Sequence, residues 1–212
     1  LIEVDDALRA FGALARDVRR TLGANELSVV AAVFGELCPV RAGRASASSP
    51  LDRMQVALRR RLPSASGRRA GAAVLCGAAD ALGRSGPWHV VSEGVLRPGV
   101  DRRIPTANEI ARTFEEHGAL FALRALRGAF AISAWNEQTE ELWLARDPTG
   151  QRVLYHARLT SGAGLAFASE AKALLARGDV SRTVDRLALV RYLVFSFVPG
   201  EPTLLEAVRE VP

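Results

Sequence analysis

Two pairs of short apolar segments, each pair joined by a polar or glycine-rich turn, constrain the fold of this chain most strongly. Residues 129–135 and 141–146 flank the polar turn at 136–139, and residues 153–159 and 164–169 form a second pair of the same kind. Apolar, β-branched and aromatic runs on either side of a short turn are typical of β-hairpins. We therefore expect antiparallel sheets in the second half of the chain.

Helical patterns lie between the predicted strands. Thr106 and Glu109 have the spacing of a capping box, which predicts a helix that continues to about His117, with another after Gly118. Further helices are expected at residues 51–62, 170–176 and 185–195, and further strands at 27–35, 70–78 and 88–95. This mixture of antiparallel strands and helices predicts an α+β fold with helical layers.

The first residues have a pattern of their own. Apolar side chains between Val4 and Leu22 recur every three or four residues, which predicts an amphipathic helix that Gly23 can end. We expect two parts: an N-terminal helical extension at residues 1–24 and a domain at residues 25–212.

Composition excludes several classes of function. The 212 residues are 49% hydrophobic and carry a net charge of +5, with Lys172 as the only lysine. The densest basic cluster, at residues 59–61 and 68–69, has no interleaved aromatic residues that could stack on bases, so no nucleic-acid partner is expected. No apolar run approaches the roughly 20 residues of a membrane span, and the acidic start is unlike a secretory signal. We expect no membrane partner and a cytoplasmic location.

Cysteines and histidines give no sign of a metal site. Cys38 and Cys76 are too few for a disulfide framework and form no C-x-x-C pair. His89, His117 and His156 are far apart in the sequence and show no ligand spacing. We therefore expect no metal ion in this chain.

A series of short motifs follows in order along the second half of the chain: Gly128-Ala129-Phe130-Ala131, Leu144-Ala145-Arg146-Asp147, Gly150, Leu154-Tyr155, Phe167-Ala168-Ser169-Glu170, Lys172-Ala173-Leu174, Asp185 and Val198-Pro199-Gly200. In order and separation they resemble the class II glutamine-amidotransferase domain at the front of the asparagine synthetase family, and the resemblance continues more weakly back to about residue 27. It implies a sandwich of the N-terminal-nucleophile hydrolase type, in which two antiparallel sheets lie between helical layers.

The resemblance also implies that the glutaminase site is degenerate at four positions. Ser28 stands where the family has a nucleophilic cysteine at its mature N-terminus, and its nitrogen is inside a peptide bond and cannot act as the base. Glu93-Gly94 replaces the Asn-Gly pair that stabilises the oxyanion, and Ala107 replaces the aspartate that holds the substrate amino group. We expect no catalytic residue in this chain.

Six further residues match the family motifs, and we expect them to be structural: Arg146, Asp147, Gly150, Tyr155, Ser169 and Glu170. Arg146 and Asp147 are the strongest charged matches, and an ion pair that fixes the loop after the hairpin is expected there. Asp147 should satisfy backbone or arginine donors, and Gly150 should supply a small residue at the turn.

Members of this family join the domain to an ATP-binding synthetase domain. The chain starts at leucine and stops about where the linker to that domain would begin, so we expect a fragment of a longer product. The leading hypothesis is a glutaminase-inactive scaffold domain of an ATP-dependent amide ligase, similar to β-lactam synthetase and lasso-peptide macrolactam synthetase. ATP and magnesium would bind to the synthetase domain, and this chain alone would not be catalytic.

Two alternatives stay open. One is a free-standing interaction protein that docks through the helix at residues 4–22. The other is a glutamine-dependent asparagine synthetase subunit that is processed at Ser28. The synthetase domain, on the same or a partner chain, is the expected partner, and a homo-oligomer is not excluded.

Overall fold

The structure is a computed structural model of the chain. It describes residues 27–29, 34–37, 49–59, 62, 66–71, 73–97, 104–160 and 164–212. The helical extension expected at residues 1–24 and Cys38 lie outside the described residues.

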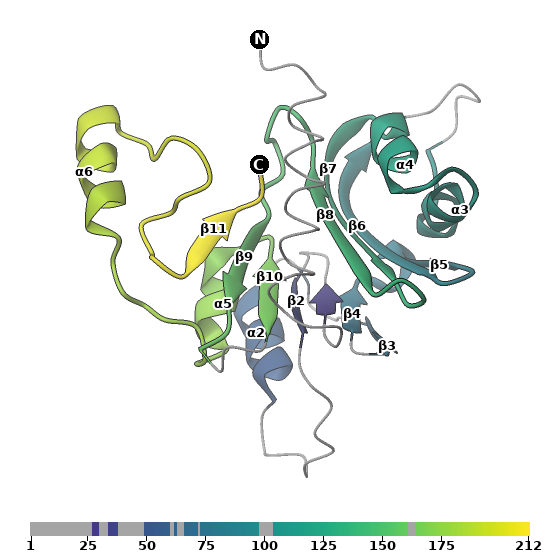
Figure 1. Cartoon of the computed structure of the whole chain (residues 1–212), viewed down its shortest axis with the longest axis horizontal. Coiled ribbons are helices and arrows are strands. Elements are labelled where there is room, and N and C mark those ends of the chain that lie inside the picture. Colours follow the sequence, from purple (N-terminus) through teal and green to yellow (C-terminus); the bar gives the residue numbers. More distant parts are fainter. Residues whose placement is uncertain are drawn as a thin grey trace.

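Within the described ranges, the strands form two sheets (Figure 1). The larger sheet contains β1 (Leu27–Val29), β2 (Phe34–Leu37), β3 (Ser66–Ala70), β4 (Ala73–Gly77), β9 (Tyr155–Arg158), β10 (Leu165–Ala168) and β11 (Val208–Glu210). Its order is β1-β4-β2-β10-β9-β11, with β3 paired to β4, and only the β1–β4 pairing is parallel. The smaller, antiparallel sheet has the order β5-β6-β7-β8 and contains β5 (Leu82–Ser85), β6 (Trp88–Leu96), β7 (Gly128–Asn136) and β8 (Glu141–Arg146).

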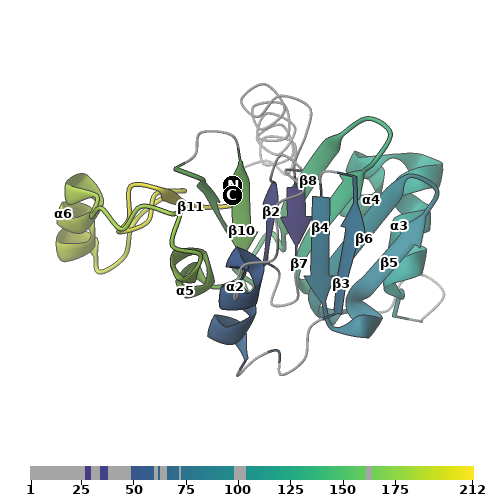
Figure 2. The same cartoon turned by 90° about the horizontal axis from the view of Figure 1, so that it is seen from below.

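Four α-helices of the described ranges cover the outer faces of the two sheets, and a fifth stands apart (Figures 1 and 2). They are α2 (Pro50–Leu58), α3 (Ala107–His117), α4 (Ala119–Ala125), α5 (Ala171–Ala176) and α6 (Arg186–Phe195), with a short 3₁₀ turn η1 (Ala79–Ala81). Helices α3 and α4 lie against the smaller sheet and α2 and α5 against the larger one, whereas α6 stands apart from both. None of the helices in the described ranges has the length and apolar character that crossing a bilayer requires.

Side chains of strand β10 show how the layers meet. Leu165 and Phe167 belong to a core cluster that also contains residues of the smaller sheet and of α3 and α4. Ala166 and Ala168 alternate with them and belong to a second cluster, which includes residues of α2 and α5. Because successive strand residues point to opposite faces, the larger sheet is covered on both sides. The layers therefore run helices, sheet, sheet, helices.

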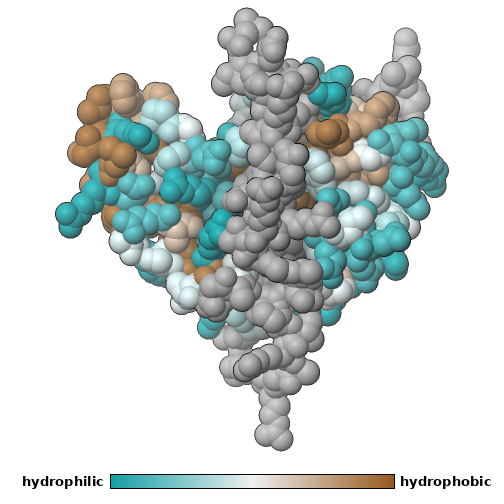
Figure 3. Space-filling model, in the orientation of Figure 1, coloured by the Kyte–Doolittle hydropathy of each residue, from teal (hydrophilic) through white to brown (hydrophobic). Residues whose placement is uncertain are grey.

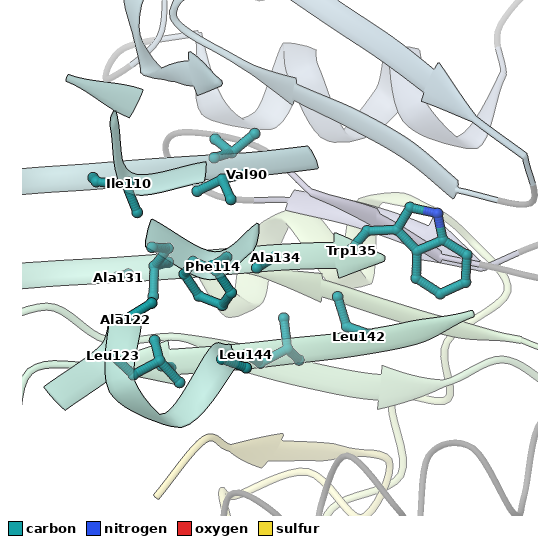
Figure 4. Close-up of a cluster of buried hydrophobic side chains, with 14 of the residues drawn as sticks. Val90, Ile110, Phe114, Ala122, Leu123, Ala131, Ala134, Trp135, Leu142 and Leu144 are labelled. Carbon is teal, nitrogen blue, oxygen red and sulfur yellow. The ribbon is translucent and has the colours of Figure 1, made fainter. Parts of the chain in front are cut away.

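Packing of the outer helical layer is visible in Figure 4. Ile110 and Phe114 of α3 lie near Val90 of β6 and Ala134 of β7, and Leu123 of α4 lies near Leu144 of β8; all are buried. This arrangement confirms the expected α+β fold and agrees with the four-layer sandwich that the resemblance implied.

Local signals in the sequence explain where the helices begin. The Thr106 hydroxyl accepts from the Glu109 N–H (3.3 Å), and the Glu109 carboxylate accepts from the Thr106 N–H (2.8 Å), which is the predicted capping box. Ser49 and Asp52 form a second capping box at the start of α2. Helix α2 ends at Leu58 rather than Leu62, because the next N–H bonds back to the Val56 carbonyl and tightens the last turn.

One strand prediction was wrong and one strand was missed. The single strand expected at residues 27–35 is two strands, since β1 runs parallel to β4 whereas β2 runs antiparallel to it. The strand expected at 70–78 is present as β4, and β3, which precedes it and pairs with it as a hairpin, was not predicted. A continuous apolar run indicates that a segment is buried, but it carries no periodic signal for where the chain reverses.

A buried arginine joins α2 to α5. Arg177 follows α5 and is 1% exposed; its guanidinium donates to both Asp179 carboxylate oxygens, through Nε (2.9 Å) and Nη2 (2.8 Å). Its carbonyl accepts from the guanidinium of Arg53 on α2. The pairing with Asp179 is needed because an unpaired buried charge is strongly destabilising.

We predict that Asp179→Ala lowers the free energy of unfolding by about 3 kcal/mol, because it leaves the Arg177 cation buried without its carboxylate. Arg177→Met should cost less, since it removes the charge together with its need for a partner. Urea denaturation of both variants measures the two losses. A larger loss for Arg177→Met would contradict the explanation.

Candidate functional site

Asp147 lies where the chain leaves the smaller sheet at the end of β8 and crosses to β9 in the larger sheet. The side chain is 1% exposed and accepts four hydrogen bonds. The donors are the Phe130 N–H (3.3 Å), the Thr149 hydroxyl (2.6 Å) and the N–H groups of Gln151 and Arg152 (2.9 Å each). One carboxylate therefore holds both the turn and the adjacent strand β7.

Two opposing effects act on the pKa of Asp147. Burial alone would raise it, but the Thr149 hydroxyl and the three backbone N–H groups stabilise the carboxylate and lower the pKa below its ordinary value. The group is therefore ionised at neutral pH.

Gly150 closes the same turn. Its N–H donates to the Asp147 carbonyl (2.9 Å), and its φ of +65° is in the left-handed region, where glycine is favoured. The loop thus places Arg152 at a defined position beside β6.

Arg152 connects this turn to the expected oxyanion position. Its Nη1 donates to the Glu93 carboxylate at 3.1 Å, and the two side chains are 33% and 12% exposed. Glu93 and Gly94 are on β6, where Gly94 pairs with Phe130, the residue whose N–H also bonds to Asp147. The structure thus brings the turn and the Glu93-Gly94 segment together around one point of β7.

Gly94 is required by its surroundings. Its φ is +126°, and a Cβ atom there would lie 2.1 Å from the Ala129 carbonyl oxygen. No larger side chain fits without moving the backbone of β7. This glycine is therefore explained by sheet packing alone.

The chemistry of this segment differs from that of an oxyanion site. Glu93 offers carboxylate oxygens, which accept hydrogen bonds, whereas a developing oxyanion needs donors. Its charge is balanced by Arg152, so the pair is neutral as a unit. The arrangement is suited to holding β6 and the crossover loop together.

Arg146 has a different partner from the one expected. The ion pair predicted with Asp147 is absent from the contacts of the described residues, and Arg146 instead pairs with Glu210. Arg146 is on β8 and Glu210 on β11, so this ion pair links the two sheets. Tyr155 lies opposite Glu210 in the β9–β11 register; burial and then the Glu210 charge raise its pKa above the ordinary value. The Asp147 carboxylate already accepts hydrogen bonds from backbone N–H groups, which explains why Arg146 pairs with Glu210 instead.

The other predicted site residues lie apart from this group. Ala107 is the first residue of α3 and is buried, and its carbonyl is so close to Gly83 of β5 that a Cβ there would meet it at 2.0 Å. Ser28 is on β1 in the other sheet, paired with Val74. Ser169 is buried just after β10, and Glu170 precedes α5 and pairs with Lys172.

The buried histidines are kept neutral by their surroundings. Burial, followed by the charges of Arg158 and Arg209, lowers the pKa of His156 to about 4. Burial also lowers the pKa of His89, although its contact with Glu137 (3.2 Å) opposes this. Cys76 is buried in the cluster between the larger sheet and its helices. In the part of the chain that the structure describes, no three His, Cys, Asp or Glu side chains gather as a metal site would require.

No motif in the sequence pointed to Arg152 or Glu210. Each is an ordinary charged residue in the sequence, and each acquires its partner 59 or 64 residues away. Spacing rules detect pairs within a helix or hairpin but not pairs that the packing of two sheets creates.

Comparison with known families gives a clear assignment. A family model described as "Glutamine amidotransferase domain" matches residues 106–212, half of the chain. The chain belongs to the glutamine amidotransferase domain family. The match includes the Asp147 turn and α6, and it begins after Glu93 and Gly94.

The curated relatives are asparagine synthetases. A protein of Mycobacterium tuberculosis (strain H37Rv) named "Putative asparagine synthetase (glutamine-hydrolyzing)" is 39% identical over 98 residues, which are 45% of this chain and 15% of that protein. "Asparagine synthetase (glutamine-hydrolyzing) 1" of Bacillus subtilis (strain 168) is 41% identical over 87 residues, 41% of this chain and 13% of that protein. The chain thus matches only about one seventh of the length of these relatives.

We predict that Asp147→Asn lowers the free energy of unfolding by about 2 kcal/mol at pH 7, because the amide cannot replace a carboxylate that accepts four hydrogen bonds. The folded-state pKa lies below the unfolded-state value near 3.8, so this stabilisation is complete above about pH 5 and is lost as the pH falls through the folded-state pKa. Urea denaturation at several pH values should show the difference between wild type and variant shrinking below pH 4. The exposed Asp80→Asn is the control and should change stability by less than about 0.5 kcal/mol.

A double-mutant cycle tests the pair of Glu93 and Arg152. We expect Glu93→Gln and Arg152→Gln to show a coupling energy of about 1 kcal/mol, which is typical of a partly buried ion pair. The control cycle combines Glu93→Gln with Arg186→Gln on α6 and should be additive. Additivity in both cycles would mean that the contact contributes nothing to stability.

Proposed function

We propose that this chain is a glutaminase-inactive amidotransferase-type domain of an asparagine-synthetase-like, ATP-dependent amide-forming ligase. In such a protein the domain acts as a scaffold beside the synthetase region. It supplies no ammonia, because the amine that reacts is already part of the substrate.

The ion pair of Glu93 and Arg152 carries this proposal. An ionised carboxylate at the position of the oxyanion donor would repel the negative charge that develops when a thiol or hydroxyl attacks an amide. Arg152 pairs with Glu93 at 3.1 Å, and its own backbone N–H is held by the Asp147 carboxylate in the turn. Glu93 is thus held in place by the fold, which supports a domain whose role does not include glutaminase activity.

Two further positions support the same conclusion. Ser28 lies within a strand, so its nitrogen is a peptide nitrogen and cannot accept a proton from its own hydroxyl. Ala107 lacks the carboxylate that could hold a substrate ammonium group, and it occupies a tightly packed contact with β5. Base, oxyanion donor and amino anchor are all replaced.

The chemistry proposed for the whole ligase uses a carboxylate and ATP. The carboxylate oxygen attacks the α-phosphorus and releases pyrophosphate, which leaves an acyl adenylate. An amine on the same substrate then attacks the acyl carbon, and AMP and a proton leave as the amide forms. Macrolactam closure of a lasso peptide and β-lactam formation are two reactions of this class. ATP and magnesium belong to the synthetase region in this proposal, and the location would be cytoplasmic.

We predict that the purified chain releases no glutamate from glutamine above the buffer blank, because the base and the oxyanion donor are missing. Glutamate release is measured by a coupled dehydrogenase assay, with asparagine synthetase 1 of Bacillus subtilis as the positive control. Ser28→Ala should leave the signal unchanged. Glutamate release that disappears in Ser28→Ala would show an active amidotransferase and refute the proposal.

A further inference from the structure

Three buried nitrogen atoms lie between the two sheets, at the end of the smaller sheet where β6 begins. They are Nδ1 of His89 on β6, Nε1 of Trp135 on β7 and Nη1 of Arg68 on β3, and within the described ranges none of them has a hydrogen-bond partner. His89 is 2% exposed and Trp135 1%. Because buried polar atoms are normally hydrogen-bonded, such a group indicates a bound water or ion.

The strand register brings two of these side chains together. His89 is directly opposite Trp135 in the β6–β7 pairing, so the two side chains share a face of the smaller sheet. Trp88 contacts Phe114 of α3, with ring centroids 5.0 Å apart, so the next residue, His89, points to the other face, toward the larger sheet. In Figure 4 the indole nitrogen of Trp135 (blue) lies on the β6 side of its ring.

Arg68 reaches the same space from the larger sheet. It is two residues before Ala70, which belongs to one core cluster with Trp135, so Arg68 points to the same side of β3 as Ala70. The turn between β3 and β4 also contacts the smaller sheet, because a Cβ atom at Gly71 would lie 3.9 Å from Cγ of Glu137. The three nitrogen atoms therefore come from three strands and two sheets.

The donors define the chemistry of the ligand. A guanidinium and an indole nitrogen can only donate hydrogen bonds, so Arg68 and Trp135 suit an acceptor and not a metal cation. A buried positive charge also favours a negative partner. The two oxygens of a carboxylate can accept hydrogen bonds from several directions, and the densely packed core around Trp135 limits the ligand to a few atoms.

His89 completes the site in its protonated form. Its Nε2 contacts Oε2 of Glu137 at 3.2 Å, and since a carboxylate accepts, the hydrogen of the neutral ring is on Nε2. The charged groups that face His89 are Glu137, Arg68 and Arg84, which is opposite it on β5. Burial and the two arginines lower the pKa of His89, whereas Glu137 raises it. An anion beside Nδ1 would offset the arginine charges and favour uptake of a proton there from solvent.

We propose that the two sheets enclose a site for a small monovalent oxyanion, held by Arg68 Nη1, Trp135 Nε1 and, after uptake of one proton, His89 Nδ1. The site does not depend on the proposed function, because His89 is four residues before Glu93, about 13 Å along a strand. Figure 3 shows mainly hydrophilic surface (teal) around β5 at this end of the smaller sheet. The bound anion would join β3 to β6 and β7, at the opposite end of the smaller sheet from the Asp147 turn.

Two arginine variants give a matched test. Arg68→Gln removes a proposed ligand, whereas Arg69→Gln removes the same charge from the next residue of β3, which is exposed and points to the opposite face. The probe is ¹³C-labelled formate, titrated into the full 212-residue chain against the bulky gluconate at constant ionic strength, and the ¹³C line width measures binding. We expect saturable broadening with wild type and Arg69→Gln, and binding at least about tenfold weaker with Arg68→Gln.

Trp135→Phe is a second variant, which removes the N–H without a change in charge. We expect it to weaken formate binding about fivefold, with circular dichroism to confirm that the variant is folded. Because the bound state holds one more proton, the apparent Kd of the wild type should rise between pH 7 and pH 8, approaching tenfold. The absence of saturable broadening with wild type, equal losses in the two arginine variants, or binding independent of pH would each overturn the proposal.

Discussion

The Asp147 carboxylate is the interaction on which this part of the structure depends. The chain must cross from the smaller sheet to the larger one after β8, and the peptide groups at such a crossing have no strand partners. Asp147 satisfies three backbone N–H groups and one hydroxyl at that point. Arg146, on the residue before it, then joins β8 to β11 through Glu210. One turn therefore fixes the relation of the two sheets and the position of Arg152.

That position gives the domain its proposed role. The loop delivers Arg152 to Glu93 of β6, at the position where we expect a glutaminase of this family to need a donor. The fold of the amidotransferase domain is retained and its packing requirements are met, as Gly94 and Ala107 show. In the proposed scaffold role the domain offers surface, and seven of the fifteen exposed large hydrophobic residues in the described ranges lie on α6.

Much of the fold could be predicted because its signals are local. The Thr106–Glu109 capping box, the hairpin of β7 and β8 and the aspartate at the start of α6 each depend on residues that are neighbours in sequence. The strand expected at residues 27–35 was wrong because nothing local marks a reversal within an apolar run. For the site, the motif predicted that Asp147 would satisfy nearby donors, but it did not indicate that Arg146 would bind Glu210.

The sequence by itself determined the α+β class, the family resemblance and the positions where we expect the family's catalytic residues to be replaced, because these follow from residue identity and short spacings. Only the tertiary structure decided which charges are paired. Arg152 meets Glu93 because the crossover loop returns to β6, and Arg146 meets Glu210 because two sheets pack face to face; no spacing in the sequence encodes either contact. The exposure of α6 was also decided by the tertiary structure, because an apolar segment has the same sequence pattern whether it is buried in a core or faces a partner.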